Sequence, residues 1–179
     1  MKRQPKSILY TGSLNAAFGI DMLLEAFKRI DDKEYELWIC GAGGIQNIVE
    51  EYAKKDKRIK YMGFLPKNEI ALLQKKCDVL VNPRSNRDEY TKYSFPSKTM
   101  EYLLSGSKVV MYPLSGIPKE YFKFINFIEG DSIEDLKNAL IGACEDKNFY
   151  NSKSQQQIEW ISTEKNSEKQ VEKVKSILE

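Results

Sequence analysis

The sequence predicts an α/β domain built on a doubly wound, Rossmann-like parallel sheet, with a helical segment at its C-terminal end. Short apolar runs alternate with stretches of helical periodicity over residues 7–128, and the loops between them contain glycine or proline. Strands separated by one helix each pair in parallel through right-handed crossovers, which places helices on both faces of the sheet. Residues 132–179 are polar and nearly all helical in pattern.

The individual elements follow from these patterns in chain order. Strands are predicted at Ser7–Thr11, Tyr35–Cys40, Ile59–Met62, Val79–Val81, Lys108–Tyr112 and Phe124–Ile128. Helices are predicted at Ile20–Ile30, Ile45–Lys55, Pro66–Lys76, from about Pro96 onward, and at Ile117–Tyr121. Proline suits the first turn of a helix, because its missing N–H costs nothing there. The low-complexity stretch Asn151–Gln157 is interpreted as a helix start or an exposed linker.

The composition predicts one soluble domain, spanning residues 1–179, in a reducing and therefore cytoplasmic compartment. The 28 basic and 26 acidic residues give a net charge of +2, which provides no case for a nucleic-acid partner. The cysteines Cys40, Cys77 and Cys144 fall singly in apolar patterns, so they are expected to be buried thiols, neither disulfides nor zinc ligands. No apolar run approaches the roughly 20 residues that span a bilayer.

The carboxyl ends of the predicted strands form the expected ligand-binding edge. The loop Gly41–Gly44 resembles part of a dinucleotide fingerprint, but it follows the second strand and lacks the last glycine, so NAD binding is not favoured. The chain has no histidine, which removes the commonest general base and metal ligand. Any catalysis must therefore use carboxylates, amides, cations or the substrate itself.

The most informative segment is Ser94–Gly106, SFPSKTMEYLLSG. The amides that follow Pro96 stay free at the helix N-terminus, where they and the helix dipole attract an anion such as a diphosphate. Lys98 lies one turn in and adds a positive charge, and Glu101 lies about one further turn along, within reach of a ribose diol. An ordinary capped amphipathic helix with a solvent-facing Glu101 explains this segment, taken alone, at least as well.

Four runs, taken in order and with their spacings, carry a wider resemblance: ILYTGSLNAAFGIDMLLEAF, LWICGAGG, IKYMGFLPKNEIALLQKKCDVLVNP and SFPSKTMEYLLSGSKVVMYPLSGIPKE. Together they resemble the donor-binding half of a family 4 glycosyltransferase, a retaining enzyme of the two-domain GT-B architecture, and they cover essentially the whole chain. The resemblance implies that the chain is the C-terminal, nucleotide-sugar-binding domain and that the N-terminal acceptor domain is absent. Residues 163–178 resemble the closing helix that packs back toward that other half.

The family roles transfer unevenly to this sequence. Glu101 matches the second Glu of the family's E-x7-E motif, which implies that it holds the ribose hydroxyls. The first Glu corresponds to Tyr93, whose hydroxyl can bond a sugar hydroxyl but cannot supply carboxylate charge. The resemblance therefore implies that Tyr93 or Ser94 orients the sugar.

Two further segments match donor contacts of the family. The amides of Phe95, Ser97 and Lys98 correspond to the segment that touches the sugar and the distal phosphate. Residues 63–65 correspond to the loop that frames the base, and a core position is the alternative for Phe64.

The loop after the first strand departs from the family pattern. An Arg and a Lys usually clamp the diphosphate there, whereas this chain has Ser13 and Phe18 at the corresponding positions. Either other cations substitute, or the domain binds weakly and catalyses poorly. The candidate substitutes are Arg84, Arg87, Lys92 and Lys98, among which Arg84 is favoured because it adjoins a strand end. Gly12 and Ser13 stay expected donor contacts.

The resemblance implies transfer of a sugar from a UDP- or GDP-sugar to an acceptor hydroxyl with retention of configuration, in cell-surface polysaccharide or glycoconjugate synthesis. It implies no metal and no cofactor, because the departing phosphate assists front-face attack. The isolated domain is expected to be inactive, since the acceptor site belongs to the absent half.

Rival interpretations stay open. One is a nucleotide-sugar binding module without catalysis, and another is a nucleotide-sugar epimerase of GT-B shape. A flavodoxin-like or receiver-type domain is a weaker third, because the phosphoacceptor aspartates expected at the first strand ends are absent. Peripheral association of the full-length protein with a membrane also stays open, since Lys2, Arg3 and Lys6 are too few to establish it.

Overall fold

An all-parallel, six-stranded sheet forms the centre of the computed structural model, which describes residues 6–86, 96–166 and 168–169. The strand order is β3-β2-β1-β4-β5-β6, so the predicted fold class is confirmed. The strands are β1 (Lys6–Thr11), β2 (Tyr35–Cys40), β3 (Ile59–Tyr61), β4 (Val79–Asn82), β5 (Lys108–Met111) and β6 (Ile125–Phe127). The helices are α1 (Ile20–Lys28), α2 (Gln46–Lys55), α3 (Lys67–Lys76), α4 (Ser97–Leu104), α5 (Ile133–Glu145), α6 (Phe149–Ser152) and α7 (Ser154–Glu164), with the 3-10 turns η1 (Ala16–Phe18) and η3 (Lys119–Phe124).

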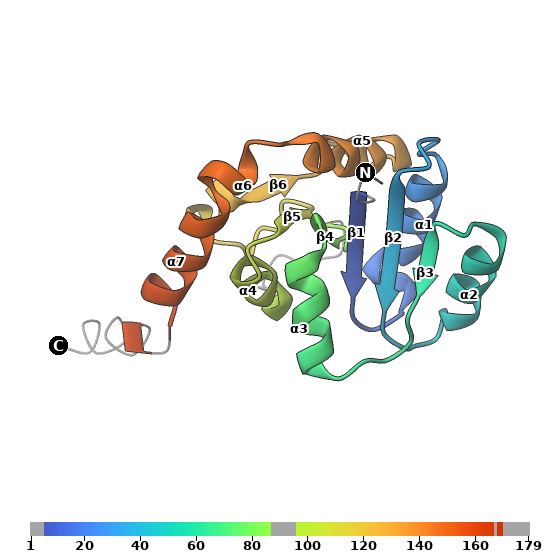
Figure 1. Ribbon diagram of the computed structural model, residues 1–179, viewed down its shortest axis with the longest axis horizontal. Coiled ribbons are helices and arrows are strands. Elements are labelled where there is room, and N and C mark those ends of the chain that lie inside the picture. Colours follow the sequence, from blue (N-terminus) through green and yellow to red (C-terminus); the bar gives the residue numbers. More distant parts are fainter. Residues whose placement is uncertain (1–5, 87–95, 167, 170–179) are drawn as a thin grey trace, which may run out of the picture.

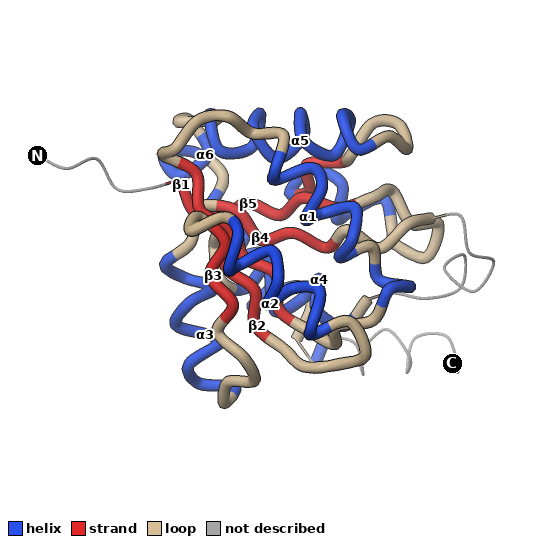
Figure 2. Tube along the Cα trace, turned by 90° about the vertical axis from the view of Figure 1, so that its right-hand side faces the viewer, coloured by secondary structure: helices blue, strands red, loops and turns tan. Residues whose placement is uncertain are grey.

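Helices cover both faces of this sheet. Figure 1 shows α3, α4 and α7 on one side of β1 and β2 and α1 and α2 on the other, and Figure 2 views the molecule from the side of α1 and α2. Helix α1 packs against α5, and α4 packs against α7. Strands β4 and β5 are almost entirely buried because helices lie on both of their faces, which explains why their sequences are continuous apolar runs.

The register of the central strands brings their carboxyl ends to one level. Strand β1 pairs with β2 over six residues, from Lys6 opposite Tyr35 to Thr11 opposite Cys40. The backbone N–H of Gly12 then donates to Cys40 O at 2.9 Å, and that of Gly41 donates to Gly63 O at 2.8 Å. The loops after β1, β2 and β3 therefore lie side by side, at the lower end of the strands in Figure 1.

One predicted helix has a different form and place. Residues 117–121 were expected to be helical from their apolar spacing, whereas the structure has a 3-10 turn at Lys119–Phe124. Pro118 caps this turn in an extended conformation, and a proline disfavours helical backbone in the residue before it. Ile117 is instead buried in the preceding turn, so its apolar character reflects the core.

The three cysteines are free thiols, as predicted. Cys40 and Cys77 are buried and Cys144 is partly buried. Burial raises the pKa of Cys40 to about 11 and that of Cys77 and Cys144 to about 12. All three thiols therefore stay protonated near neutral pH, which makes them poor nucleophiles.

Lys6 has a structural role in the fold. Its ammonium contacts the carboxylates of Asp32 and Glu145 and lies 4.6 Å from the centre of the Tyr35 ring. The hydroxyl of Tyr35 also donates to Glu145 at 3.0 Å. These contacts tie the start of β1 to the end of α5, so Lys6 is not a free charge for a membrane surface. Each helix in the described ranges is too short or too polar to cross a bilayer.

The C-terminal helices hold the end of α4. The stretch Asn151–Gln157 covers the end of α6 and the first turn of α7, and its last residue is fully buried, so the exposed-linker interpretation is wrong. The amide Nε2 of Gln157 donates to Leu103 O at 2.8 Å and to Ser107 O at 3.2 Å. The hydroxyl of Ser154 donates to Gly106 O at 2.7 Å. Helix α7 therefore supplies side-chain donors to three carbonyls at and just after the end of α4, of which Leu103 O also accepts the backbone N–H of Gly106 at 3.3 Å.

Replacing this amide is expected to destabilise the domain. Gln157→Leu keeps the volume but removes both hydrogen bonds, so the free energy of unfolding should fall by about 1–3 kcal/mol. Urea titration followed by circular dichroism measures this loss. The matched change Gln156→Leu lies on the exposed side of α7 and should leave the midpoint unchanged; equal midpoints for the two variants would show that the buried amide does not support α4.

Candidate functional site

The loops at the carboxyl ends of β1 to β3 are held in place by tyrosine side chains. Tyr10 OH donates to Ser13 O at 2.8 Å, and Tyr61 OH donates to Gly41 O at 2.9 Å. A Cβ on Gly41 would lie 1.7 Å from Gly12 O, so the first two loops approach at a distance that only glycine permits. The backbone after β1 thus forms a fixed floor for the site.

Helix α4 begins at this floor. Pro96 is its N-cap residue, with extended backbone angles of φ −64° and ψ 115°, and Ser97 is the first helical residue. The first backbone N–H groups of a helix have no intrahelical acceptor, so they stay available to an anion. The apolar periodicity of the segment buries Thr99, Tyr102 and Leu103 against the sheet and leaves Glu101 exposed.

Tyr102 fixes α4 to the end of β1. Its side chain is fully buried, and its hydroxyl lies 3.1 Å from Thr11 Oγ1 and accepts the N–H of Thr11 at 3.3 Å. Burial raises the pKa of Tyr102 to about 12, so the phenol stays neutral at physiological pH. Tyr102, which follows Glu101 in α4, therefore fixes the orientation of α4 relative to the loop after β1.

Lys98 reaches from α4 to the backbone of β1. Its ammonium donates to Thr11 O and lies 5.6 Å from the centre of the Tyr10 ring, a cation–π distance. A Cβ on Gly12 would come within 1.8 Å of Lys98 Nζ, so glycine at position 12 leaves the space that this ammonium fills. Burial lowers the pKa of Lys98, and the nearby Glu101 carboxylate partly opposes this shift.

Two cavities meet at Lys98. The larger one, of about 720 Å³, is lined by Thr11, Gly12, Phe64, Leu65, Lys67, Ile70, Ala71, Gln74, Lys75, Lys98, Glu101, Leu104, Ser105, Ile158 and Ser162. The smaller one, of about 460 Å³, is lined by Tyr10, Thr11, Ser13, Phe18, Asn82, Arg84, Pro96, Ser97, Lys98 and Tyr102. Thr11 and Lys98 line both, so a ligand that spans the two cavities must pass the Lys98 ammonium.

The smaller cavity contains a second cation. The Arg84 guanidinium lies 5.6 Å from the centre of the Phe18 ring, within cation–π range. The sequence has Ser13 and Phe18 where an Arg and a Lys were expected. The structure brings Arg84 to Phe18 and Lys98 to Gly12, which adjoins Ser13, so two cations lie beside the loop that lacks its own.

The site residues predicted from the sequence are distributed as follows. Gly12, Phe64, Lys98 and Glu101 line the larger cavity, and Ser13, Arg84, Ser97 and Lys98 line the smaller one. Tyr93, Ser94 and Phe95, like Arg87 and Lys92, lie outside the described residues.

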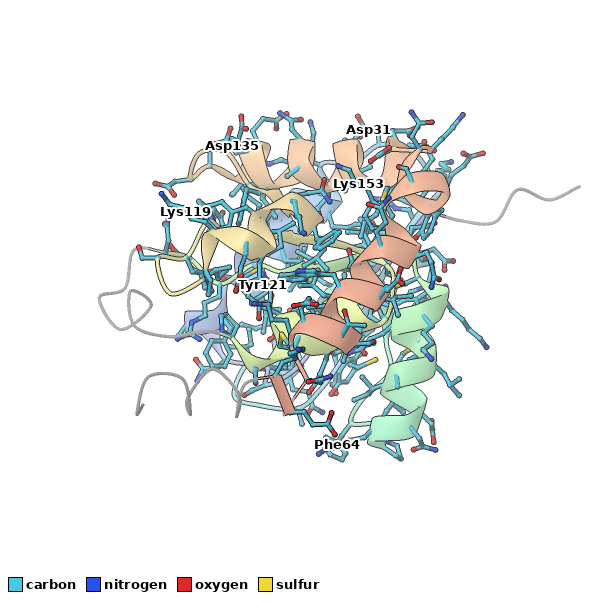
Figure 3. The ribbon with its side chains drawn as sticks, turned by 90° about the vertical axis from the view of Figure 1, so that its left-hand side faces the viewer. Asp31, Phe64, Lys119, Tyr121, Asp135 and Lys153 are labelled. Carbon is cyan, nitrogen blue, oxygen red and sulfur yellow. The ribbon has the colours of Figure 1, made fainter. Side chains whose placement is uncertain are left out.

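Phe64 is not part of the core. Its side chain is 80% exposed, and Figure 3 shows it at the same end of the molecule as the strand carboxyl termini. The core alternative for this residue is therefore wrong, because the loop after β3 turns its apolar side chain outward at the rim of the larger cavity.

Sequence reasoning missed several residues that shape the site. Tyr10, Thr11 and Tyr102 looked like ordinary core residues, since two lie in an apolar strand run and the third on the apolar face of α4. A tyrosine among aliphatic residues was the available signal, because a buried phenol needs a hydrogen-bond partner. Gln74 also lines the larger cavity, and its position within a helical pattern gives no sign of this.

Within residues 6–86, 96–166 and 168–169, no group of three or more cysteine, aspartate or glutamate side chains is placed to hold a metal ion.

Comparison with family models identifies the chain. The model described as "Glycosyl transferases group 1" matches residues 5–146, well over half of the sequence. The chain belongs to the glycosyl transferase group 1 family. Within this glycosyltransferase domain, the matched range contains β1 to β6, the loops after β1 and β3 that line the cavities, and the whole of α4. Comparison with curated proteins gave no significant match.

Solved glycosyltransferase structures share the fold of this domain. The C-terminal domain of a group 1 glycosyl transferase from Francisella tularensis matches with a TM-score of 0.70 and 18% identity, over 90% of this chain and 86% of that chain. WaaG, a glycosyltransferase of lipopolysaccharide biosynthesis, matches with a TM-score of 0.72 and 19% identity, over 90% of this chain and 44% of that chain. HepE from Anabaena, in complex with UDP and glucose, matches with a TM-score of 0.69 and 18% identity, over 89% and 44%. The domain thus spans less than half the length of WaaG and HepE.

Proposed function

We propose that this glycosyltransferase domain binds a nucleoside diphosphate sugar across its two cavities and presents it for retaining transfer to an acceptor hydroxyl. The observation that carries the proposal is the position of Lys98, which lies at the junction of both cavities beside the start of α4. A diphosphate at this junction receives the Lys98 charge, the α4 amides and the helix dipole together.

The larger cavity is suited to the nucleoside. Glu101 lies one turn of α4 beyond Lys98, so its exposed carboxylate is placed to accept hydrogen bonds from a ribose diol. Phe64 and Leu65 supply apolar surface at the rim. The structural neighbour HepE was solved with UDP and glucose, which supports the same class of ligand here.

The smaller cavity is suited to the sugar and the distal phosphate. Ser97 offers its amide and hydroxyl, and Asn82 offers an amide side chain. Arg84 lines the smaller cavity and not the larger one, and it supplies a second cation there. Charge that develops on the leaving diphosphate would thus be stabilised by two cations.

The proposed reaction needs no protein nucleophile. The bond between the anomeric carbon and the phosphate oxygen breaks, and its electron pair stays on the phosphate. The acceptor oxygen forms the new bond on the same face of the sugar, and its proton passes to the departing phosphate. Lys98, Arg84 and the α4 amides stabilise that phosphate, which accounts for transfer by a chain without histidine.

The remaining parts of the proposal concern the whole protein. The domain is proposed to work with a separate acceptor-binding domain, and UDP- or GDP-sugars are the donors considered. The role of WaaG in lipopolysaccharide biosynthesis supports a role in cell-surface glycoconjugate synthesis.

Calorimetric titration with UDP, GDP and their common sugar conjugates tests donor binding. Removing the carboxylate in Glu101→Ala should weaken nucleotide binding by about tenfold or more, because charged hydrogen bonds to the ribose are lost. Glu69→Ala, on the first turn of α3 and outside both cavities, is the matched control and should bind normally. A folded wild-type domain that binds none of these nucleotides would contradict the proposal, and binding that Glu101→Ala does not weaken would remove Glu101 from it.

A further inference from the structure

Helix α7 has the larger cavity on one side and the turn η3 on another. Ile158 and Ser162, about one helical turn apart, line the cavity. Trp160 packs against Tyr121 and Phe124 of η3, with ring centres 5.0 and 5.4 Å apart. Residues two apart on a helix point in nearly opposite directions, because each residue turns the helix by about 100°. A shift of α7 relative to η3 would therefore move the cavity wall that Ile158 and Ser162 form.

Lys165 joins the end of α7 to η3. Its side chain is only 5% exposed, and its ammonium forms an ion pair with Glu120. The same ammonium lies 5.2 Å from the centre of the Tyr121 ring and 4.8 Å from the ring centre of Trp160, a cation–π distance to both. A lysine side chain is almost never buried unless it is paired, and here one carboxylate and two rings compensate for the lost water. Lys165 is therefore held at a defined position between α7 and η3.

The cavity wall lies between two attachments of α7. Near the start of the helix, Gln157 Nε2 donates to Leu103 O at 2.8 Å and ties α7 to α4. At the end of the helix, Lys165 ties α7 to η3. Ile158 and Ser162 fall between these two points in the chain. Lys165 lines neither cavity, so any effect of its charge on ligand binding must be transmitted through α7.

We propose that Lys165 is a positioning residue for nucleotide binding. By holding α7 against η3, it keeps Ile158 and Ser162 at the distance from α3 that the nucleoside needs. The diphosphate lies at the start of α4 and does not depend on this wall. Lys165 thus raises the affinity for the nucleoside part of the donor without contacting it. This inference rests on the proposed function, because it assumes that the nucleoside lies in the larger cavity.

Calorimetric titration with UDP, GDP and inorganic pyrophosphate tests this role. Lys165→Met keeps the apolar stem between the two rings but removes the charge, so it should weaken the binding of UDP or GDP about fivefold. Pyrophosphate has no nucleoside, so its affinity should stay within about twofold of the wild-type value. A residue that only stabilises the fold would change both affinities by the same factor.

Lys153→Met is the matched control. It removes an exposed lysine charge at the N-cap of α7, labelled in Figure 3, and should bind all three ligands like the wild type. The inference would be overturned, while donor binding stands, if Lys165→Met bound nucleotide as tightly as Lys153→Met or lost pyrophosphate affinity to the same extent. A wild-type domain that binds neither nucleotide nor pyrophosphate would overturn the proposed function and this inference together.

A second variant decides the matter if Lys165→Met does not fold. Glu120→Gln breaks the same ion pair from its half-exposed side and leaves Lys165 between its two rings. It should lower nucleotide affinity about threefold relative to pyrophosphate affinity. A ratio equal to that of the wild type would overturn the inference.

Discussion

Replacing Lys98 by methionine is expected to weaken UDP or GDP binding by about 100-fold, or roughly 3 kcal/mol. Methionine keeps most of the apolar stem but removes the only side-chain cation that lines both cavities in the described part of the chain. The diphosphate would keep the α4 amides but lose the full charge at its centre. Calorimetry on the folded variant measures the change.

The control for this variant is another lysine on the same side of the sheet. Lys76→Met removes one exposed charge from the end of α3 and contacts neither cavity, so affinity should stay within about twofold. An affinity for Lys98→Met that equals that of Lys76→Met would mean that the diphosphate does not lie at the junction.

The lowered pKa of Lys98 predicts opposite pH dependences for nucleotide affinity and for the stability of the fold. Nucleotide affinity should fall as pH rises toward this pKa, which lies below the ordinary 10.5, because the anion needs the charged ammonium. Stability moves the other way: the unfolded chain binds the proton more tightly, so the contribution of Lys98 to the unfolding free energy rises between the lowered pKa and 10.5. Titrations from pH 7 to 10 should show the loss of affinity in the wild type and not in Lys98→Met.

Replacing Gly41 by alanine is expected to destabilise the domain by about 3 kcal/mol or more. The added Cβ would lie 1.7 Å from Gly12 O and 2.9 Å from Gly12 C, and both are backbone atoms that cannot turn aside. The backbone of Gly41 also has a φ of +146°, a conformation that other residues rarely adopt. Relief of the clash would separate the loops after β1 and β2, so nucleotide binding should be lost in any molecules that still fold.

The chain offers a matched control in the same loop. A Cβ on Gly44 has no atom within 4 Å, so Gly44→Ala should change the unfolding free energy by no more than about 0.5 kcal/mol. Thermal unfolding of both variants compares the two positions. If Gly41→Ala unfolds at the same temperature as Gly44→Ala and the wild type, the loops after β1 and β2 are not in close contact.

Much of the fold could be predicted from local pattern. Strand β2 has the bounds expected from its apolar run, and α3 and α4 begin directly after Pro66 and Pro96. These features are local, because the burial of a strand and the cap of a helix depend on neighbouring residues in the chain. The 3-10 turn at Lys119–Phe124 was not predicted, because Ile117 is buried in the core and its apolar character does not mark the start of a helix.

The candidate site was predictable only in part. Lys98 and Glu101 could be named because they lie on successive turns of one helix. The contact of Lys98 with Thr11 and that of Arg84 with Phe18 join residues far apart in the chain, and no periodicity encodes them. The sequence named Arg84 and Lys98 among the candidate substitutes for the cations absent at Ser13 and Phe18, but only the packing of α4 and of the end of β4 brings these two beside that loop.

The most direct test of the account is to map nucleotide binding by NMR on the backbone amides of the domain. Titration with UDP or GDP should shift the amides of Gly12, Ser13, Ser97 and Lys98 most strongly, followed by those of residues 63–65 at the rim of the larger cavity. Inorganic pyrophosphate should shift the first group and leave residues 63–65 unchanged. Nucleotide-induced shifts that avoid Gly12 and the start of α4 would contradict a donor site at the Lys98 junction.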